Sequence, residues 1–400
     1  MATSTTGVSD TTSREGPWLY VMLALLGTAG FFYVNLAAAI VDGLTSTLGF
    51  SSAQAGTVMS TNIYGASVGG LIAVFVVRRL PWRPVLVGLL CVVLALELAS
   101  LMVHSYGVLL PLRAVDGLVG GMSVGVALSL LARTRFPDRA FGSLLAFQFA
   151  FGGLGSWWLP ELVKEHGTWV LFACMAAMDV AAVITAIFLR MRDTPRLADG
   201  VATANLPATR SIALTVATLL ALFLFQAANM GLFAFIIPLG QSHALTLSFI
   251  SRTVGWTTWI GTLGALFVIV FGTKFGRTRP LSVAMVVTLI GIAALYWSSH
   301  SSVFFAANAS TAITWSFVVP YLFGIVSMLD RTGRLATLAG FISGLGLASG
   351  PLFAGWVVGP NDYGPLISMG LAFLVIATVA MLVAARRVDG LGRTMATEVV

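Results

Sequence analysis

The residues of this chain that could do chemistry are a few ionisable side chains set inside long apolar runs. They are Glu97, Arg113, Asp116, Asp179 and Arg252. An ionisable group at bilayer depth costs about 2.5–3.5 kcal/mol on insertion scales, so each is a candidate for binding a solute or carrying a proton. Arg113 and Asp116 have i, i+3 spacing, which places them on nearly the same face of one helix and favours an ion pair.

Each of these groups also has a purely structural interpretation. Arg113 with Asp116 could bind a solute or respond to protons, or could fasten its helix to the first one. Glu97 and Asp179 could relay protons, or could be neutral, hydrogen-bonded acids. Asp42, at the end of the first apolar run, could exchange partners with Arg113 or be a solvated helix end.

Arg252 is followed by Trp256 and Trp259, so one helix face carries a cation and two indole rings. Such a face could hold an anionic or aromatic solute, or could anchor the helix at headgroup depth. Other polar or aromatic residues inside apolar runs are candidates to line a binding pocket. They are Asn35, Gln148, Gln226, Asn229, Asn308 and Trp315.

The sequence offers no pattern for a metal or an enzyme's active site. No Cys and His spacing resembles a metal site, and no cluster of acids and histidines stands in a loop beside the membrane. Cys91 and Cys174 fall in apolar runs, where small buried residues are expected rather than a disulfide. We therefore predict no metal, no cofactor and no enzymatic activity.

Composition requires the elements that hold these residues to lie in a bilayer. Of 400 residues, 58% are hydrophobic and only 9% are charged, whereas a soluble domain carries roughly 25% charged residues. Apolar runs long enough to cross a bilayer predict an all-α polytopic membrane protein with twelve transmembrane helices. The predicted spans are 17–42, 52–77, 84–103, 106–132, 140–161, 167–190, 211–239, 248–272, 280–299, 302–329, 335–358 and 364–385.

The net charge of +7 follows membrane topology and does not indicate nucleic-acid binding. With the N-terminus in the cytoplasm, the 22 Lys and Arg residues all fall in inside segments except Lys164, Arg113 and Arg252. This bias is the positive-inside rule. It predicts a multi-pass protein of the bacterial inner membrane with both termini in the cytoplasm.

The chain divides into two halves. The polar stretch 191–210 predicts a cytoplasmic linker between one six-helix bundle at 17–190 and another at 211–386. We expect residues 1–16 to be a disordered cytoplasmic tail, and residues 387–400 to be a second cytoplasmic tail.

The two bundles look like repeats. The segment RRLPWRP at 78–84 is echoed by TKFGRTRP at 273–280, and with this offset Asn35 falls near Asn229. Duplicated halves with a site between them are a common plan in transporters.

The basic loops resemble a motif of the major facilitator superfamily, roughly G-x-x-x-D-R-x-G-R-R after helix two. Arg79 matches the motif arginine and Arg83 a later basic residue, while the motif aspartate is replaced by Arg78. The second copy keeps Gly276 and Arg277 and also lacks the acid. The resemblance implies a gating role for Arg79, Arg83, Gly276 and Arg277, and leaves the family's acidic latch in doubt.

Two further motifs carry the resemblance. Arg113 and Gly117 match the family's R-x-x-x-G pattern on helix four, and Gly350 with Pro351 resembles its Gly-Pro helix motif. The resemblance implies two pseudo-symmetric six-helix bundles with a cavity lined by helices one, four, seven and ten. It also places the helices of Glu97 and Asp179 away from that cavity.

These observations predict a secondary active transporter that moves a small organic solute by alternating access, coupled to protons. Arg113 and Arg252, one from each half, favour an organic anion such as a carboxylate. The aromatic-rich cavity helices would also suit proton-driven efflux of a drug or metabolite. A non-transporting receptor on the same fold is the alternative of another class. The expected partners are the solute, protons and the lipid bilayer, and the chain is expected to be a monomer.

Overall fold

The computed structural model of the protein describes residues 16–76, 81–189, 212–272, 274–329 and 334–397. These residues form fifteen α-helices and one short 3-10 helix, and their only β structure is two isolated bridges. Ten of the described helices are long and apolar enough to cross a membrane. The chain is therefore an all-α, multi-pass membrane protein, as its composition predicts.

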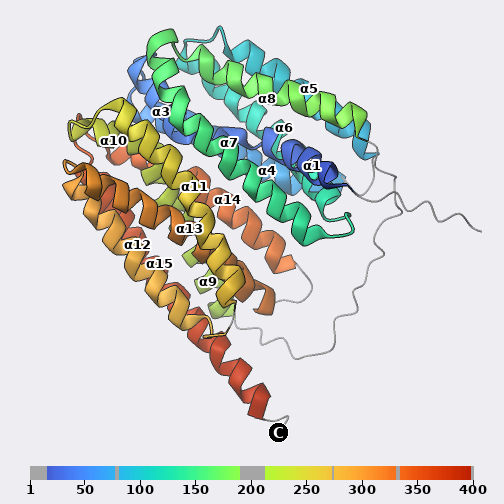
Figure 1. The fold of residues 1–400 in the computed structure, drawn as a ribbon, viewed down its shortest axis with the longest axis vertical. Helices are drawn as coiled ribbons and strands as arrows, with labels where there is room; N and C mark the ends of the chain where they lie inside the picture. The colour runs from blue at the N-terminus through green and yellow to red at the C-terminus, as the bar shows by residue number, and fades with distance from the viewer. Residues whose placement is uncertain (1–15, 77–80, 190–211, 273, 330–333, 398–400) are drawn as a thin grey trace, which may run out of the picture.

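The N-terminal half contains α1 to α8 (Figure 1). Their bounds are α1 (Pro17–Ala29), α2 (Phe32–Asn35), α3 (Ala37–Ser46), α4 (Ser52–Val76), α5 (Trp82–Ser100), α6 (Tyr106–Leu131), α7 (Pro137–His166) and α8 (Trp169–Phe188). In the C-terminal half they are α9 (Ile212–Ala234), α10 (Ile236–Ser242), α11 (Leu247–Phe271), α12 (Thr278–Ala294), η1 (Leu295–Trp297), α13 (Ser301–Leu329), α14 (Arg334–Val357) and α15 (Gly364–Thr397).

The ten candidate spans leave out α7 and the short helices α1 to α3 and α10, the last of which continues the line of α9. If α1, α2 and α3 form one interrupted crossing and α7 forms another, the count reaches the predicted twelve. The twelve-helix count stays a prediction on this basis.

The first and seventh predicted helices are interrupted, not continuous. The first breaks at Gly30–Phe31 and again at Leu36, and the seventh breaks at Phe235. At the two breaks in the first helix, the N–H groups of Phe31 and Leu36 donate hydrogen bonds to the carbonyls three residues back. These are the carbonyls of Thr28 and Tyr33, at 2.9 and 3.2 Å. The two interrupted helices occupy corresponding positions in the repeated halves, and such a pair of interrupted helices points to a binding site in transporters.

The last helix runs further than predicted. Hydropathy ends it at residue 385, but α15 continues to Thr397 and so passes through most of the predicted tail. The extension is free of proline but includes Gly390 and Gly392, which are poor helix formers. Asp389 on it contacts another part of the fold, described below.

Glycines bring α4 and α6 into backbone contact. A Cβ at Gly117 would lie 1.9 Å from the carbonyl oxygen of Asn62, so only glycine allows this approach. Gly272 and Gly276 have a different role, in a turn. Gly272 ends α11 and Gly276 lies in the turn beyond it, both with positive φ, +49° and +71°.

The two halves meet at one end of the bundle and diverge toward the other (Figure 1). We call the end where α1 begins and α15 finishes the terminal end. At the opposite end α3 contacts α9 and α10, and α4 packs on α14 so closely that a Cβ at Gly355 would lie 3.1 Å from the Cα of Ala53. α7 and α11 also pack together across the two halves.

Candidate functional site

A central cavity of about 220 Å³ lies between the two halves, next to the helix breaks. Phe31 and Asn35, at the breaks in the first helix, line it, as does Ile236, directly after the break at Phe235. None of the described residues that line it is charged. Carboxamides, threonine hydroxyls and aromatic rings make its walls.

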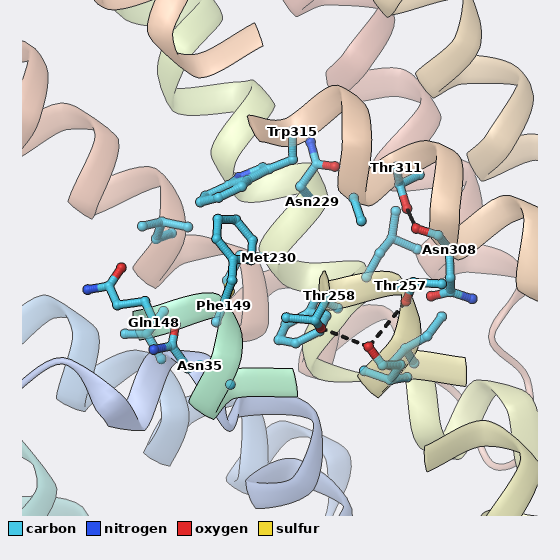
Figure 2. Close-up of a pocket in the computed structure, with 18 of the residues that line it drawn as sticks. Asn35, Gln148, Phe149, Asn229, Met230, Thr257, Thr258, Asn308, Thr311 and Trp315 are labelled. Atoms are coloured by element: carbon cyan, nitrogen blue, oxygen red, sulfur yellow. Dashed lines mark hydrogen bonds between the residues drawn. The ribbon is translucent and has the colours of Figure 1, made fainter. Parts of the chain in front are cut away.

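Five of the predicted pocket residues do line this cavity. Figure 2 shows their side chains coming from both halves of the fold. They are Asn35, Gln148, Asn229, Asn308 and Trp315. The two repeat-related asparagines, Asn35 and Asn229, therefore both border the cavity.

The asparagines leave polar atoms available to a ligand. Asn35 Nδ2 is buried and has no hydrogen-bond partner within the described part of the chain. Asn229 Nδ2 and Asn308 Nδ2 each donate 2.8 Å bonds to carbonyls one turn back, those of Phe225 and Phe304. Their Oδ1 atoms therefore remain as acceptors on the cavity wall.

Gln226 lies behind the cavity and holds one of its walls in place. Its Oε1 accepts a 2.7 Å bond from Trp315 Nε1, and its Nε2 donates a 2.7 Å bond to Ser343 Oγ. Because this buried amide ties α9 to both α13 and α14, it fixes the indole ring of Trp315 against the cavity.

A second cavity continues from the first toward the terminal end. It shares Phe31 and Leu347 with the central cavity and runs past Ser67 to Val74 and Thr337, near the terminal ends of α4 and α14. The two cavities therefore adjoin and together extend from the helix breaks toward the terminal end, while helix packing closes the opposite end.

Arg113 does not line the cavity. Its side chain is fully buried inside the N-terminal half, where Nη1 bonds Glu97 Oε1 at 2.8 Å and Asp116 Oδ2 at 3.3 Å. The other terminal nitrogen of the guanidinium, Nη2, donates a hydrogen bond to Ser100 Oγ. The predicted pair of Arg113 with Asp116 is present, and Glu97 from α5 is its stronger partner by distance.

Asp179 on α8 completes a cluster of buried charges with Glu97, Arg113 and Asp116. All four side chains are at most 4% exposed, and the charges of the other three act on Asp179. Glu97 Oε2, Asp116 Oδ1 and Asp179 Oδ1 have no hydrogen-bond partner among the described residues. Three carboxyl groups surround one guanidinium, so full ionisation would leave two negative charges uncompensated.

Tyr33 and Asn62 connect this charge cluster to its surroundings. Asn62 Nδ2 donates a 2.8 Å bond to Asp116 Oδ2. The Arg113 guanidinium carbon lies 5.7 Å from the centre of the Tyr33 ring, a cation–π distance. Tyr33 belongs to α2, between the cavity residues Phe31 and Asn35. The short helix α2 therefore contacts both the charge cluster and the cavity.

Asp42 lies apart from this cluster. It is a buried residue of α3, near the opposite end of the bundle, and the charge acting on it is that of Lys164 and not that of Arg113. The structure thus does not bring Asp42 to Arg113, the exchange of partners that sequence suggested.

The predicted stripe on α11 faces the other half. Trp256 and Trp259 form a three-ring cluster with Trp157 of α7, with centroids 5.2 to 5.6 Å apart. Trp259 Nε1 donates a 3.2 Å bond to the carbonyl of Ala150. Arg252 is exposed and does not line the cavity. These tryptophans join the halves through α7 and α11.

The predicted gating residues fall in several environments. Arg79 lies outside the described residues. Arg83 donates a hydrogen bond to the carbonyl of Leu189, which ties the start of α5 to the end of α8. Gly276 and Arg277 form the turn between α11 and α12.

A carboxylate that sequence reasoning missed organises that turn. Asp389 of α15 accepts 3.0 Å bonds from the N–H of Arg277 and bonds of 2.9 and 2.7 Å from the N–H and hydroxyl of Thr278. The second copy of the motif lacks an acid in the turn itself, and a residue from the last helix supplies one.

Sequence reasoning also missed Tyr33, Asn62, Phe149 and Trp157. Asn62 is a polar residue in the middle of an apolar run, which was a usable signal. The other three are aromatic residues in aromatic-rich helices, and nothing in the sequence separates them from ordinary packing residues.

This fold, with a cavity between two bundles, is the architecture of a membrane transporter. The family model of the Major Facilitator Superfamily matches residues 18–351. The chain therefore belongs to this superfamily, which its motifs resemble. No curated protein sequence matches it significantly.

Solved structures share the fold at low sequence identity. The nucleoside transporter NupG has a TM-score of 0.71 and 14% identity, over 92% of this chain and 98% of that one. A bacterial homologue of the human lysosomal transporter Spinster, inward-facing and unoccupied, has a TM-score of 0.68 and 15% identity, over 92% of this chain and 96% of that one. A D-xylose–proton symporter has a TM-score of 0.68 and 14% identity, over the same shares.

Proposed function

We propose that the chain is a secondary active transporter that moves a small organic solute by alternating access and couples this movement to protons. The charge cluster of Glu97, Arg113, Asp116 and Asp179 is the observation that carries the coupling. Its carboxyl groups outnumber its one guanidinium, and several carboxyl oxygens have no partner among the described residues. Buried carboxylates without compensation are strongly disfavoured, so the cluster is suited to take up protons while it is closed to water.

The link from solute to proton would run through α2. This helix carries Tyr33 against Arg113 and lies between breaks that border the cavity. A solute that moves Phe31 or Asn35 would displace Tyr33 as well. Such a shift would alter the environment of the charge cluster and hence its affinity for protons.

The positive-inside bias supports an orientation with the terminal end in the cytoplasm of a bacterial cell. In that orientation the second cavity opens to the cytoplasm and the structure is an inward-open state. Outward opening would require the contacts of α3 with α10, and of α4 with α14, to separate.

The comparisons support a small polar solute in a general way. Two of the structural neighbours are named as a nucleoside transporter and a D-xylose–proton symporter. The preference for an organic anion has lost its support, because neither Arg113 nor Arg252 lines the cavity.

Proteoliposomes that enclose a pH-sensitive dye test this proposal. Uridine, p-nitrophenyl-β-D-glucopyranoside, benzoate and tetraphenylphosphonium would be added one at a time under an imposed pH gradient. We expect solute-dependent proton movement in the wild type, and its loss in Asp116→Asn and Asp179→Asn. Glu165→Gln, which changes an exposed carboxylate, is the matched control and should behave as the wild type.

The sign of the proton movement separates symport from efflux by antiport. Solute movement without protons in every variant would overturn the coupling. Solute binding without any movement would favour the receptor alternative.

A further inference from the structure

The central cavity combines two features that together restrict what it can bind. No described residue in its wall is charged, and one buried amide nitrogen in its wall, Asn35 Nδ2, has no hydrogen-bond partner among the described residues. The first feature bears on the charge of a solute and the second on its hydrogen-bonding groups.

An ionic solute would find no counter-charge in the cavity. The Arg113 guanidinium is fully buried and already paired with Glu97 and Asp116, and Arg252 is exposed outside the cavity wall. The acids of the charge cluster likewise lie behind Tyr33 and Asn62, and not on the cavity surface. Because a charge moved into a dry site without a partner is strongly disfavoured, the cavity selects against organic anions and organic cations alike.

A purely apolar solute would also fit poorly. Asn35 Nδ2 needs an acceptor, and the Oδ1 atoms of Asn229 and Asn308 are open to donors. An apolar solute would leave these groups without water and without partners, which costs affinity. A solute with hydroxyl or amide groups would satisfy both kinds of atom, since such groups donate and accept.

The walls also include flat aromatic surfaces from both halves. Phe149 comes from α7 and Trp315 from α13 (Figure 2). Gln226 fixes the indole of Trp315 by a 2.7 Å hydrogen bond. A rigid ring held in one orientation favours stacking on a planar ligand. The volume of about 220 Å³ suits a small solute more than a drug-sized one.

Resting on the proposed transport function, we propose that the solute is uncharged and carries a planar ring together with several hydroxyl or amide groups. Neutral nucleosides and aryl glycosides belong to this chemical class. Asn35, Asn229 and Asn308 hydrogen-bond its polar groups, and Phe149 and Trp315 contact its ring.

Binding to the wild-type protein in nanodiscs, measured by isothermal titration calorimetry against empty nanodiscs, tests this class with matched probes. p-Nitrophenyl-β-D-glucopyranoside is compared with p-nitrophenyl-β-D-glucuronide, which replaces one CH2OH by a carboxylate, and with p-nitroanisole, which lacks the sugar. Uridine is compared with uridine 5′-monophosphate. We expect the glucoside, uridine or both to bind. A neutral probe that binds should do so at least tenfold more tightly than its charged counterpart, and the glucoside also at least tenfold more tightly than the sugar-free p-nitroanisole. Equal or tighter binding of a charged or sugar-free probe, or of tetraphenylphosphonium, overturns the proposal. So does the absence of binding by both the glucoside and uridine.

Variants assign the binding to this cavity. Asn35→Ala and Asn308→Ala, one in each half, should each weaken binding of the neutral probe at least fivefold. Gln241→Ala removes an exposed carboxamide of α10 and should change nothing. Melting temperatures show whether each variant is folded. If one asparagine variant fails to fold, the affinity of the other asparagine variant tests the assignment. Unchanged affinity in a folded asparagine variant overturns the assignment.

The proposed solute class and the proposed proton coupling can each be overturned without the other. If the neutral probe binds and crosses liposomes without protons, the coupling is wrong and the solute class stands. If protons move only with benzoate or another anion, the coupling stands and the solute class is wrong.

Discussion

At the residue scale, the charge cluster depends on a single cation. Arg113 is the partner of both Glu97 and Asp116, and its side chain is fully buried. Removing one partner of a buried ion pair costs roughly 3–5 kcal/mol, because the remaining charge is left uncompensated. We expect Arg113→Met to lower the stability of the detergent-solubilised protein by an amount of this order, measured by thermal or denaturant unfolding.

A second substitution serves as the control for this prediction. Glu97→Gln added to Arg113→Met removes one of the stranded carboxylates and should recover part of the loss. An Arg113→Met protein that unfolds at the wild-type temperature would show that the cluster is not the ionic network described above.

Gln226 allows a prediction about binding without a direct contact. Gln226→Leu would leave Trp315 Nε1 without its acceptor and would free the ring to reorient. The net value of such a hydrogen bond is about 1 kcal/mol, so we expect the KM for transport to rise about fivefold while folding is kept. Transport kinetics in proteoliposomes measure this, and an unchanged KM would contradict the positioning role of Gln226.

The sequence indicated which residues are unusual, but it did not indicate which of them contact one another in the fold. Glu97, Arg113, Asp116 and Asp179 stand out because each is ionisable inside an apolar run. Their convergence could not be predicted, because three helices contribute to the cluster and no spacing shows which faces oppose one another. The carboxamides that line the cavity were predictable for a related reason, since amides are rare in lipid-facing helices.

At the element scale, the contact of α4 with α6 depends on glycine. A methyl group at Gly117 would meet the carbonyl of Asn62 at 1.9 Å, so the helices would have to separate. Overpacking of this kind costs typically 1–3 kcal/mol. We expect Gly117→Ala to lower the unfolding temperature, while Gly88→Ala on α5, where a Cβ meets nothing within 4 Å, should be neutral or slightly stabilising. Equal behaviour of the two variants would contradict the close packing.

The turn between α11 and α12 depends on Asp389 in the same way. Asp389→Asn weakens the bonds from the backbone of Arg277 and Thr278, and hydrogen bonds to a charged group are worth about 1.5–3 kcal/mol. We expect faster trypsin cleavage at Lys274 and Arg277, detected by peptide mapping. Asp362→Asn, at the opposite end, should leave cleavage there unchanged. If Asp389→Asn is cleaved no faster than the wild type, α15 does not hold this turn.

Hydropathy predicted the helices but not their interruptions. The segments that contain α1 to α3 and α9 to α10 are apolar throughout, so a sliding average reads each as one span. The breaks at Leu36 and Phe235 occur at ordinary apolar residues, and tertiary packing around the cavity decides them. Asp389 was missed because predicted helix boundaries follow hydropathy, while α15 continues past its apolar part.

At the scale of the whole molecule, the superfamily fold could be predicted from the duplicated basic loops, the R-x-x-x-G and Gly-Pro motifs and the charge bias. The conformation could not be predicted, because under the proposed alternating access the same sequence supports a cavity open to either side. The structure is closed at the end where α4 meets α14 and is open at the terminal end. Transport by alternating access requires the closed end to open in turn.

A reversible disulfide across the closed end tests that requirement most directly. In a background with Cys91 and Cys174 replaced by serine, Ala53→Cys with Gly355→Cys joins α4 to α14. A Cβ at Gly355 would lie 3.1 Å from the Cα of Ala53 and 2.5 Å from the carbonyl oxygen of Ser52, so the reduced pair must first be shown to transport. The matched control, Gly291→Cys with Ser310→Cys, joins α12 to α13 within one half, with a Cβ–Cβ distance of 3.4 Å. Transport of the solute that moves in the liposome assay is then measured before oxidation, after oxidation and after reduction. Alternating access predicts that oxidation abolishes transport only in the pair across the halves, and that reduction restores it. Undiminished transport by the fully cross-linked pair would contradict the account.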